Sequence, residues 1–118
     1  MGKIGIKRIY EPPEPTDGQR ILIDRLWPRG VAKEAAELTL WLREIAPSAD
    51  LRKWFGHDPA RFDAFRDRYR KELNENGEAV AALCDRAAKG DVTLLYGAHD
   101  ETCNQAVVLA QYLREHCR

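Results

Sequence analysis

Charged and aromatic side chains are concentrated in one short segment, residues 21–30, which reads ILIDRLWPRG. An apolar run leads into Asp24, and two arginines, Arg25 and Arg29, follow on either side of Leu-Trp-Pro. Two guanidinium groups so close together could clamp a phosphate, a sulfate or a carboxylate. Asp24 could act as a general base or orient an arginine, and Trp27 could form a stacking wall. The segment therefore predicts a site for a small anion.

A second group of polar residues occurs in the sequence GAHDETCNQ at 97–105. His99 and Asn104 could donate hydrogen bonds to a ligand. The sequence TCNQ at 102–105 matches a helix capping box, which would place Cys103 in the first turn of a helix. The positive end of the helix dipole favours a thiolate there, so Cys103 is a candidate nucleophile or redox-sensitive thiol. Inert partial burial of Cys103 is the alternative.

Several familiar chemistries lack the residues that they need. A phosphatase or sulfurtransferase of the Cys-loop type would have a cysteine directly after the buried strand, followed by an arginine. Tyr96 stands at that position, and no arginine follows before Arg114. The chain also has no dinucleotide-binding glycine fingerprint, no Walker loop and no Gly-x-Ser-x-Gly elbow. The sequence thus assigns no reaction, and the catalytic candidates are Asp24 and Cys103.

Metal binding would have to use histidine, carboxylate and thiol groups whose spacing fits no recognised ligand pattern. These groups are His57, His99, Asp100, Glu101 and Cys103. We expect neither a metal nor a cofactor.

The composition bounds the class of protein. The chain has 118 residues, 44% hydrophobic and 32% charged, which suits one domain with its own core. Its 19 basic and 19 acidic residues give a formal net charge of zero, which argues against nucleic-acid binding over the whole surface. No apolar run approaches the roughly 18 residues of a membrane span, and residues 1–13 lack the apolar segment of a secretory signal. We expect a cytoplasmic protein that contacts neither nucleic acid nor membrane.

The three cysteines, Cys84, Cys103 and Cys117, are irregularly spaced, and their odd number does not indicate a disulfide framework. Cys84 falls on an apolar helical stripe and is expected to pack in the core. Cys117 is expected to lie in a frayed tail. The sequence therefore predicts no disulfide.

Three segments have the pattern of β-strands. Residues 3–10 alternate, whereas residues 20–26 and 91–96 carry continuous apolar runs that are typical of strands covered on both faces. Trp27-Pro28 ends the second strand, because proline has no N–H for the sheet ladder. The long, mostly helical connection between the second and third strands predicts a parallel pair. The direction of the first strand stays open.

Helical spacing of Leu38, Trp41, Leu42 and Ile45 predicts a helix that Pro47 ends. Ser48 is a good N-cap and Gly56 a good C-cap for a short helix at 49–55. Further helices are predicted from Asp58-Pro59 to Asn76-Gly77, from there to Gly90, and from Thr102 to about His116.

These elements predict an α/β fold: a small single domain with a few-stranded, mainly parallel sheet flanked by helices. Ligands in such sheets bind beyond the carboxyl ends of the strands, where residues 24–30 and 97–104 would meet beside the positive end of the last helix. We therefore expect a small anionic molecule to bind there. The expected ligand-binding residues are Arg25, Trp27, Arg29, Lys33, His99 and Asn104.

Two alternatives stay open. In the first, Asp24 and Arg25 form a structural ion pair and Trp27 covers the core. In the second, the protein is a non-catalytic interaction or regulatory module. It would then dock a protein or nucleic-acid partner through Trp27, Trp41, Trp54 and the basic helix face within residues 52–71.

Five stretches carry a resemblance to a known family: KRIYEPP, DGQRILIDRLWPRGVAKE, WLREIAPS, LRKWFGHDPARFDAFRDRYRKEL and VTLLYGAHDETCNQAVVLAQYL. Over nearly its whole length the chain resembles the YeaO-like proteins, a branch of the family called domain of unknown function 488. The resemblance implies a small α/β domain and carries no established activity. Larger members have Asp-Val-Arg…Pro after one strand, similar to Asp24-Arg25…Pro28, and Cys-His-Arg after a later strand. The counterpart of the second motif is Cys103-Asn104-Gln105, which lacks the His and the Arg.

Overall fold

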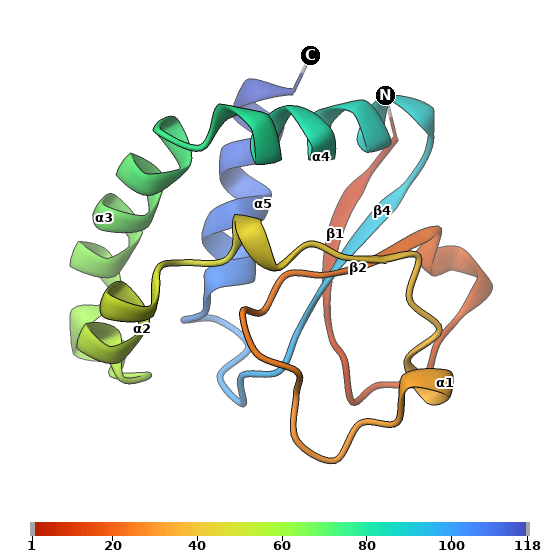
Figure 1. The fold of residues 1–118 in the computed structure, drawn as a ribbon, viewed down its shortest axis with the longest axis horizontal. Helices are drawn as coiled ribbons and strands as arrows, with labels where there is room; N and C mark the ends of the chain where they lie inside the picture. Colours follow the sequence, from red (N-terminus) through yellow and green to blue (C-terminus); the bar gives the residue numbers. More distant parts are fainter. Residues whose placement is uncertain (1, 118) are drawn as a thin grey trace.

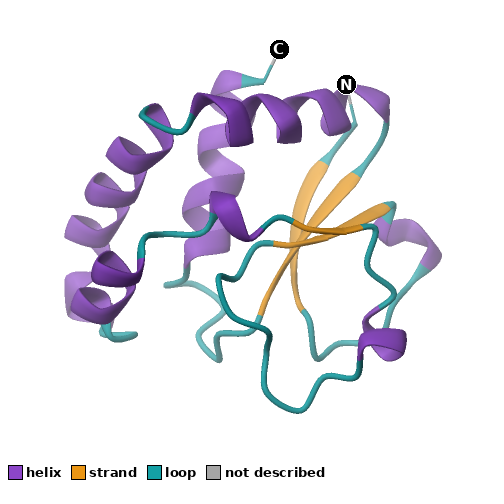
Figure 2. Cartoon of the chain, in the orientation of Figure 1, coloured by secondary structure: helices purple, strands orange, loops and turns teal. Residues whose placement is uncertain are grey.

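The computed structural model describes residues 2–117. They fold into a parallel sheet of four strands with helices around it (Figure 1, Figure 2). The strands are β1 (Ile4–Arg8), β2 (Gln19–Leu22), β3 (Leu40–Trp41) and β4 (Val92–Tyr96). Their order across the sheet is β1-β4-β2-β3, and every neighbouring pair is parallel. The α/β class and the parallel pairing of the second and last predicted strands are confirmed. The first strand, whose direction the sequence left open, is parallel to β4.

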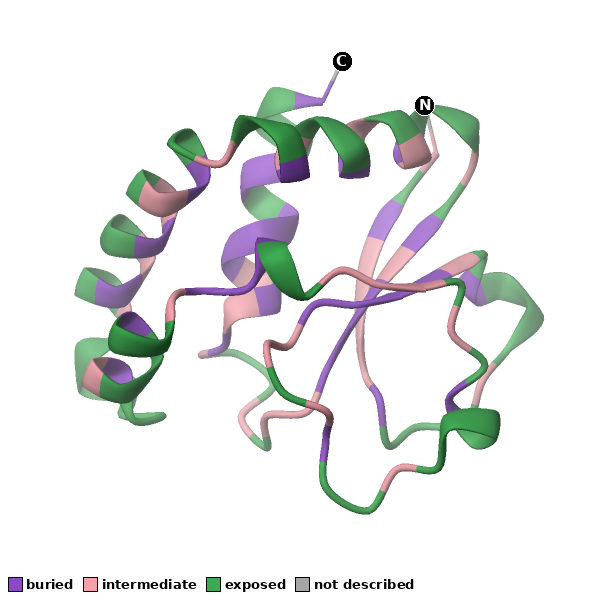
Figure 3. Ribbon diagram, viewed as in Figure 1, coloured by how far each residue is buried: buried purple, intermediate pink, exposed green. Residues whose placement is uncertain are grey.

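The two central strands bury both of their faces. Ile21 and Leu94 point into a core that they share with α2 (Ala49–Phe55), α3 (Phe62–Asn74), α4 (Gly77–Lys89) and α5 (Gln105–His116). Leu22 and Leu95 point to the opposite face, where they pack with Ala36 of α1 (Lys33–Ala36). Figure 3 shows buried residues on the inner sides of the helices and exposed residues outside. The continuous apolar runs are therefore explained by a sheet that is covered on both sides.

The short helix α2 has the predicted bounds. The Ser48 hydroxyl accepts a hydrogen bond of 3.1 Å from the Leu51 amide, so it satisfies one of the free amides of the first turn. Gly56 ends the helix in the left-handed conformation with a φ of 52°. Local capping chemistry thus predicts the bounds of this helix, and the carboxylate of Glu72 in α3 holds its start by accepting the Ser48 amide at 2.9 Å and the Ser48 hydroxyl at 2.6 Å.

The predicted helix around residues 38–45 is wrong. Helix α1 has one turn and ends at Glu37, which has a φ of 46°. Leu40 and Trp41 then form β3, and a 3-10 turn follows at Arg43–Ile45. The edge of β2 offers backbone hydrogen-bond partners to residues 40–41. Pairing with this buried strand is more favourable than a helix that only the spacing of four apolar residues supports.

The second predicted strand is shorter than expected. Ile23 still donates its amide to the Leu95 carbonyl at 3.1 Å, but the chain leaves the sheet at Asp24. Residues 24–26, predicted as strand, instead begin the loop that carries the site. None of the helices within residues 2–117 has the length and apolar composition needed to cross a membrane.

The prediction that the protein has no disulfide is also wrong. Cys84 of α4 and Cys117, which directly follows α5, form a disulfide with a Cα–Cα distance of 5.1 Å. Cys117 is buried instead of frayed. The two cysteines are 33 residues apart, and only the packing of α4 against α5 brings them together. Cys103 is the free cysteine.

We expect Cys84→Ala to lower the free energy of unfolding of the oxidised protein by about 3 kcal/mol, because the crosslink restricts the unfolded chain. Urea unfolding with and without a reductant measures this difference. Cys103→Ala is the matched control and should change little. Equal stability of the wild type in oxidising and reducing buffer would contradict a stabilising crosslink.

Candidate functional site

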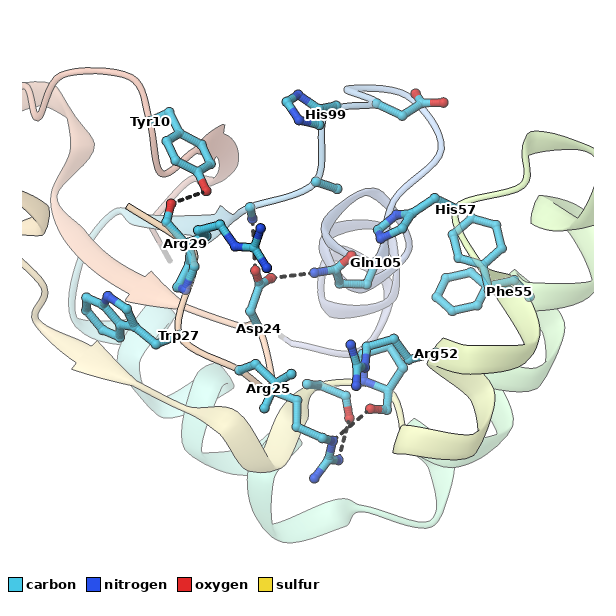
Figure 4. Close-up of a pocket in the computed structure, with 18 residues that line it drawn as sticks. Tyr10, Asp24, Arg25, Trp27, Arg29, Arg52, Phe55, His57, His99 and Gln105 are labelled. Atoms are coloured by element: carbon cyan, nitrogen blue, oxygen red, sulfur yellow. Dashed lines mark hydrogen bonds between the residues drawn. The ribbon is translucent and has the colours of Figure 1, made fainter. Parts of the chain in front are cut away.

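A pocket of about 690 Å³ lies beyond the carboxyl ends of β2 and β4 (Figure 4). The loop after β2 forms one wall, the loop after β4 and the start of α5 form the second, and α2 with its flanking turns forms the third. The lining residues are Tyr10, Asp24, Arg25, Leu26, Trp27, Pro28, Arg29, Ala46, Pro47, Arg52, Phe55, His57, Phe65, Gly97, Ala98, His99, Asp100 and Gln105. The pocket thus occupies the sheet edge at which parallel α/β proteins bind ligands.

Asp24 holds two of these walls together. Its Oδ2 accepts the Gly97 amide at 2.9 Å, and its Oδ1 accepts the Gln105 side-chain amide at 2.5 Å. Its backbone carbonyl accepts the indole N–H of Trp41 at 2.7 Å. One residue therefore fixes the loop after β2 to the end of β4, to the first residue of α5 and to the edge strand β3.

Burial raises the pKa of the Asp24 carboxyl from its usual 3.8 to about 6. The hydrogen bonds from Gly97 and Gln105 and the positive charge of Arg52 act in the opposite direction, but they do not cancel the loss of water. Within residues 2–117, no lysine, arginine or histidine forms an ion pair with this carboxylate. A desolvated carboxylate in a pocket is a mark of a functional site.

The hydrogen bond between Asp24 and the Gly97 amide requires a glycine, because the Asp24 side chain lies too close to residue 97 for a Cβ atom. A Cβ at this position would lie 2.9 Å from the Asp24 Oδ2 and 3.4 Å from the Pro28 Cβ. A larger residue at this position would displace the Asp24 carboxylate or the Pro28 ring.

Arg25 and Arg29, the two arginines that the sequence predicts to bind an anion, point in different directions. Arg25 turns away from Asp24, and it donates to the backbone carbonyls of Pro47 at 3.0 Å and Ala46 at 3.3 Å (Figure 4). The ion pair considered between Asp24 and Arg25 is therefore not formed. Arg29 lies at the rim of the pocket, and no carboxylate in the described chain pairs with it.

Trp27 and His99 both line the pocket. The Trp27 indole donates to the Val31 carbonyl at 2.7 Å, and its ring meets Trp41 edge-on at a centroid distance of 5.3 Å. The His99 Nδ1 lies 3.4 Å from the guanidinium of Arg8. Both residues are held in place by neighbours outside the pocket.

The remaining predicted residues, Lys33, Cys103 and Asn104, do not line the pocket. Asn104 is fully buried, and its side chain caps α5 by accepting the amides of Ala106 at 2.8 Å and Val107 at 3.1 Å. These helix amides are thus unavailable to an anion.

The predicted capping box at 102–105 is wrong. Asn104 is the N-cap, so Thr102 and Cys103 precede the helix, and the carboxylate of Asp100 instead accepts the backbone amides of both. The Gln105 side chain, which a capping box would use, goes to Asp24. Asn104 is a strong N-cap because its side-chain oxygen accepts two amides of the first turn. The Gln105 side chain is therefore free to donate to the Asp24 carboxylate. Cys103 therefore does not lie in the first helical turn.

Part of the pocket was not predicted in its observed role. Arg52 and Phe55 of α2 were not assigned to the site, His57 was considered only as a metal ligand, and Gln105 only as part of a capping box. The signal for the turn that carries His57 was the helix end at Gly56. His57 follows with a φ of 57°, so two successive left-handed residues turn the chain back to the pocket. Arg52 lies one turn before Gly56 and, like Arg29, has no carboxylate partner in the part of the chain that the structure describes.

Among residues 2–117, no group of three or more histidine, cysteine, aspartate or glutamate side chains is placed to hold a metal ion. The pocket thus combines one desolvated carboxylate at its base with two guanidinium groups that no carboxylate of residues 2–117 pairs with, between apolar walls.

Asp24→Asn should stabilise the protein above pH 6 by about 1 to 2 kcal/mol. Because the folded state raises the pKa of Asp24, it binds the proton more tightly than the unfolded state does. The free energy of unfolding therefore falls as the pH rises from about 4 to about 6. Asparagine removes the charge, and its Oδ1 still accepts the Gly97 amide while its Nδ2 donates to the oxygen of a Gln105 side-chain amide that has turned by 180°. The difference from the wild type should therefore disappear near pH 4. Urea unfolding between pH 4 and pH 8 tests it, and a variant that is less stable than the wild type at pH 8 would contradict the account.

Gly97→Ala should lower the free energy of unfolding by about 1 to 3 kcal/mol, because the new methyl group displaces Asp24 or Pro28. Gly5→Ala on the neighbouring strand β1 is the matched control, since its Cβ would meet no atom within 4 Å. Thermal unfolding of both variants gives the comparison. Equal effects of the two changes would show that the contact of Gly97 with Asp24 is not tight.

Comparisons with known proteins show the family to which the chain belongs. A family model described as the inactive DUF488-N3 subclade matches residues 3–118. The uncharacterised protein YeaO of Escherichia coli is 46% identical over 94% of this chain and 96% of its own length. Uncharacterised proteins of Mycobacterium bovis and Mycobacterium tuberculosis are each 39% identical over 94% of this chain and 93% of their own. No solved structure shows a significant match. The chain therefore belongs to the DUF488 family, in the subclade described as inactive and among the YeaO-like proteins.

Proposed function

We propose that the protein binds a small organic anion in the pocket at the ends of β2 and β4. The observation that carries this proposal is the pair of guanidinium groups, Arg29 and Arg52, which flank the pocket without a carboxylate partner among residues 2–117. Guanidinium groups bind carboxylates and phosphates through two parallel hydrogen bonds. An anion is the ligand whose charge complements this rim.

The other walls favour a ligand with an apolar body. Phe55, Phe65, Leu26, Pro28 and Pro47 contribute apolar surface next to the two arginines. A pocket of about 690 Å³ with a few polar groups is typical of sites for small molecules. The Phe55 and Phe65 rings stack with centroids 4.2 Å apart, which gives this wall a fixed shape. The ligand is therefore an organic acid with an apolar part, not an inorganic ion.

We propose binding without turnover. Asp24 accepts two hydrogen bonds and serves as a structural link, and Cys103 lies outside the pocket. The description of the matching family model as inactive supports the same view. A protein that recognises a ligand without changing it would act as a sensor or carrier of that ligand.

The docking-module alternative has less support. All three tryptophans are half-buried, and arginines stack on two of them: Arg43 on Trp41 at 3.8 Å, and Arg68 on Trp54 at 4.0 Å. On the basic helix, Arg66 pairs with Asp63, and Arg70 pairs with Glu115. Neither the aromatic rings nor these arginines are free in the way that a docking surface requires.

The proposed location is the cytoplasm. In a reducing compartment Cys84 and Cys117 would be thiols for most of the time. Neither residue lines the pocket, so binding would not depend on the disulfide.

Arg29→Gln and Arg52→Gln should each weaken the binding of an apolar carboxylate by about tenfold or more, because each removes one charged partner. The probes are 3-phenylpropanoate, 4-methylpentanoate and indole-3-propanoate, measured by thermal shift and then by calorimetry. Lys53→Gln is the matched control, since it removes a positive charge from the same helix without touching the pocket. If Lys53→Gln weakens binding as much as Arg52→Gln does, or if neither these acids nor carboxylates with an additional polar group bind, the proposal is wrong.

A further inference from the structure

Asp24 lies at the base of the pocket and forms no ion pair with any positive group of the described residues 2–117. Its two hydrogen-bond donors, the Gly97 amide and the Gln105 side-chain amide, are both neutral. Arg25, the nearest cation along the chain, is committed to the carbonyls of Ala46 and Pro47. Taking a carboxylate out of water without a counter-charge costs free energy, so the site is poised to accept a cation.

The carboxylate also has free capacity for hydrogen bonds. Two carboxylate oxygens can accept about four hydrogen bonds in total, and Asp24 accepts two from the protein. Asp24 lines the pocket, so a ligand bound there lies next to this residue. An ammonium group has three donors and a positive charge, and it would satisfy both needs.

The positive groups lie close by. Arg52 is near enough for its charge to lower the pKa of the Asp24 carboxyl, yet the two side chains form no ion pair. Figure 4 shows Arg29 and Arg52 approaching the space beside Asp24 from two sides, with Phe55 beyond Arg52. The pocket thus presents a hydrogen-bond acceptor for a cation, hydrogen-bond donors for an anion and an apolar wall within one cavity.

We propose that the ligand carries an amine as well as an acid, and that it is an apolar amino acid. Its ammonium group pairs with Asp24, its carboxylate binds Arg29 and Arg52, and its side chain packs against Phe55, Phe65 and Leu26. This inference rests on the proposed function, because it assigns the anion to the same two arginines. The amino-acid proposal adds Asp24 as a second recognition group, and a simple organic acid would leave the Asp24 carboxylate without a cation.

The test compares ligands that differ by one charged group. Phenylalanine, leucine and tryptophan are measured beside the acids that lack the amine, which are 3-phenylpropanoate, 4-methylpentanoate and indole-3-propanoate. The amines that lack the acid are phenethylamine, isoamylamine and tryptamine. At pH 7.5, at least one amino acid should bind about tenfold or more tightly than both of its analogues, because each analogue leaves one buried or unpaired charge unsatisfied.

Asp24→Asn provides the second arm. It keeps the shape of the side chain and removes the charge, so the amino acid and its deaminated acid should bind the variant within about twofold of each other. Arg52→Gln should weaken both of these ligands together. Melting temperatures of the variants without ligand show that they are folded.

The outcomes separate the two proposals. If an acid binds as tightly as its amino acid and needs Arg29 and Arg52, anion binding stands and the amine is not recognised. If the amine alone binds as tightly as the amino acid, the assignment of the carboxylate to the arginines is wrong. If neither acids nor amino acids bind, both proposals fall.

Discussion

The hydrogen bonds of Asp24 are the interaction on which the pocket depends. Through its carboxylate and its carbonyl, this residue joins the end of β2 to Gly97 at the end of β4, to Gln105 at the start of α5, and to Trp41 of β3. Asp24 and Trp41 lie in the first half of the chain, whereas Gly97 and Gln105 lie near its end. Parallel strands bring their carboxyl ends to the same edge of a sheet, and Asp24 is the group that fixes the loops there. The small size of Gly97 is the steric condition for that link.

This link leaves a charge that the protein does not neutralise. Burial raises the pKa of Asp24 to about 6, and its two donors are neutral amides. Meanwhile Arg29 and Arg52 lie beside the same cavity without carboxylate partners in the described chain. Groups of opposite charge that are close and yet unpaired are the pattern expected where a ligand supplies the missing partners. They are the basis of the proposal that the site recognises a ligand, and the matching family model is described as an inactive subclade.

The third wall of the pocket comes from the helical half of the chain. Helix α2 ends at Gly56, and the left-handed conformations of Gly56 and His57 turn the chain so that His57 lies at the pocket. Phe55 belongs at once to the main core and to the pocket wall, where it stacks on Phe65. The packing that stabilises the core therefore also sets the shape of the site. Arg52 is carried to the rim by the same helix.

The sequence by itself determined the elements whose signals are local. The apolar runs at 21–23 and 94–95 gave buried strands, and Ser48 and Gly56 gave the bounds of α2, because burial on both faces and helix capping depend on neighbouring residues. Tertiary structure decided the rest. Residues 40–41 became a strand because β2 had a free edge, Cys84 met Cys117 because α4 packs on α5, and Arg25 turned to distant carbonyls while Arg52 came to the pocket. A polar side chain is oriented by whichever donor or acceptor the fold brings near it, and periodicity in the sequence records only which face is apolar.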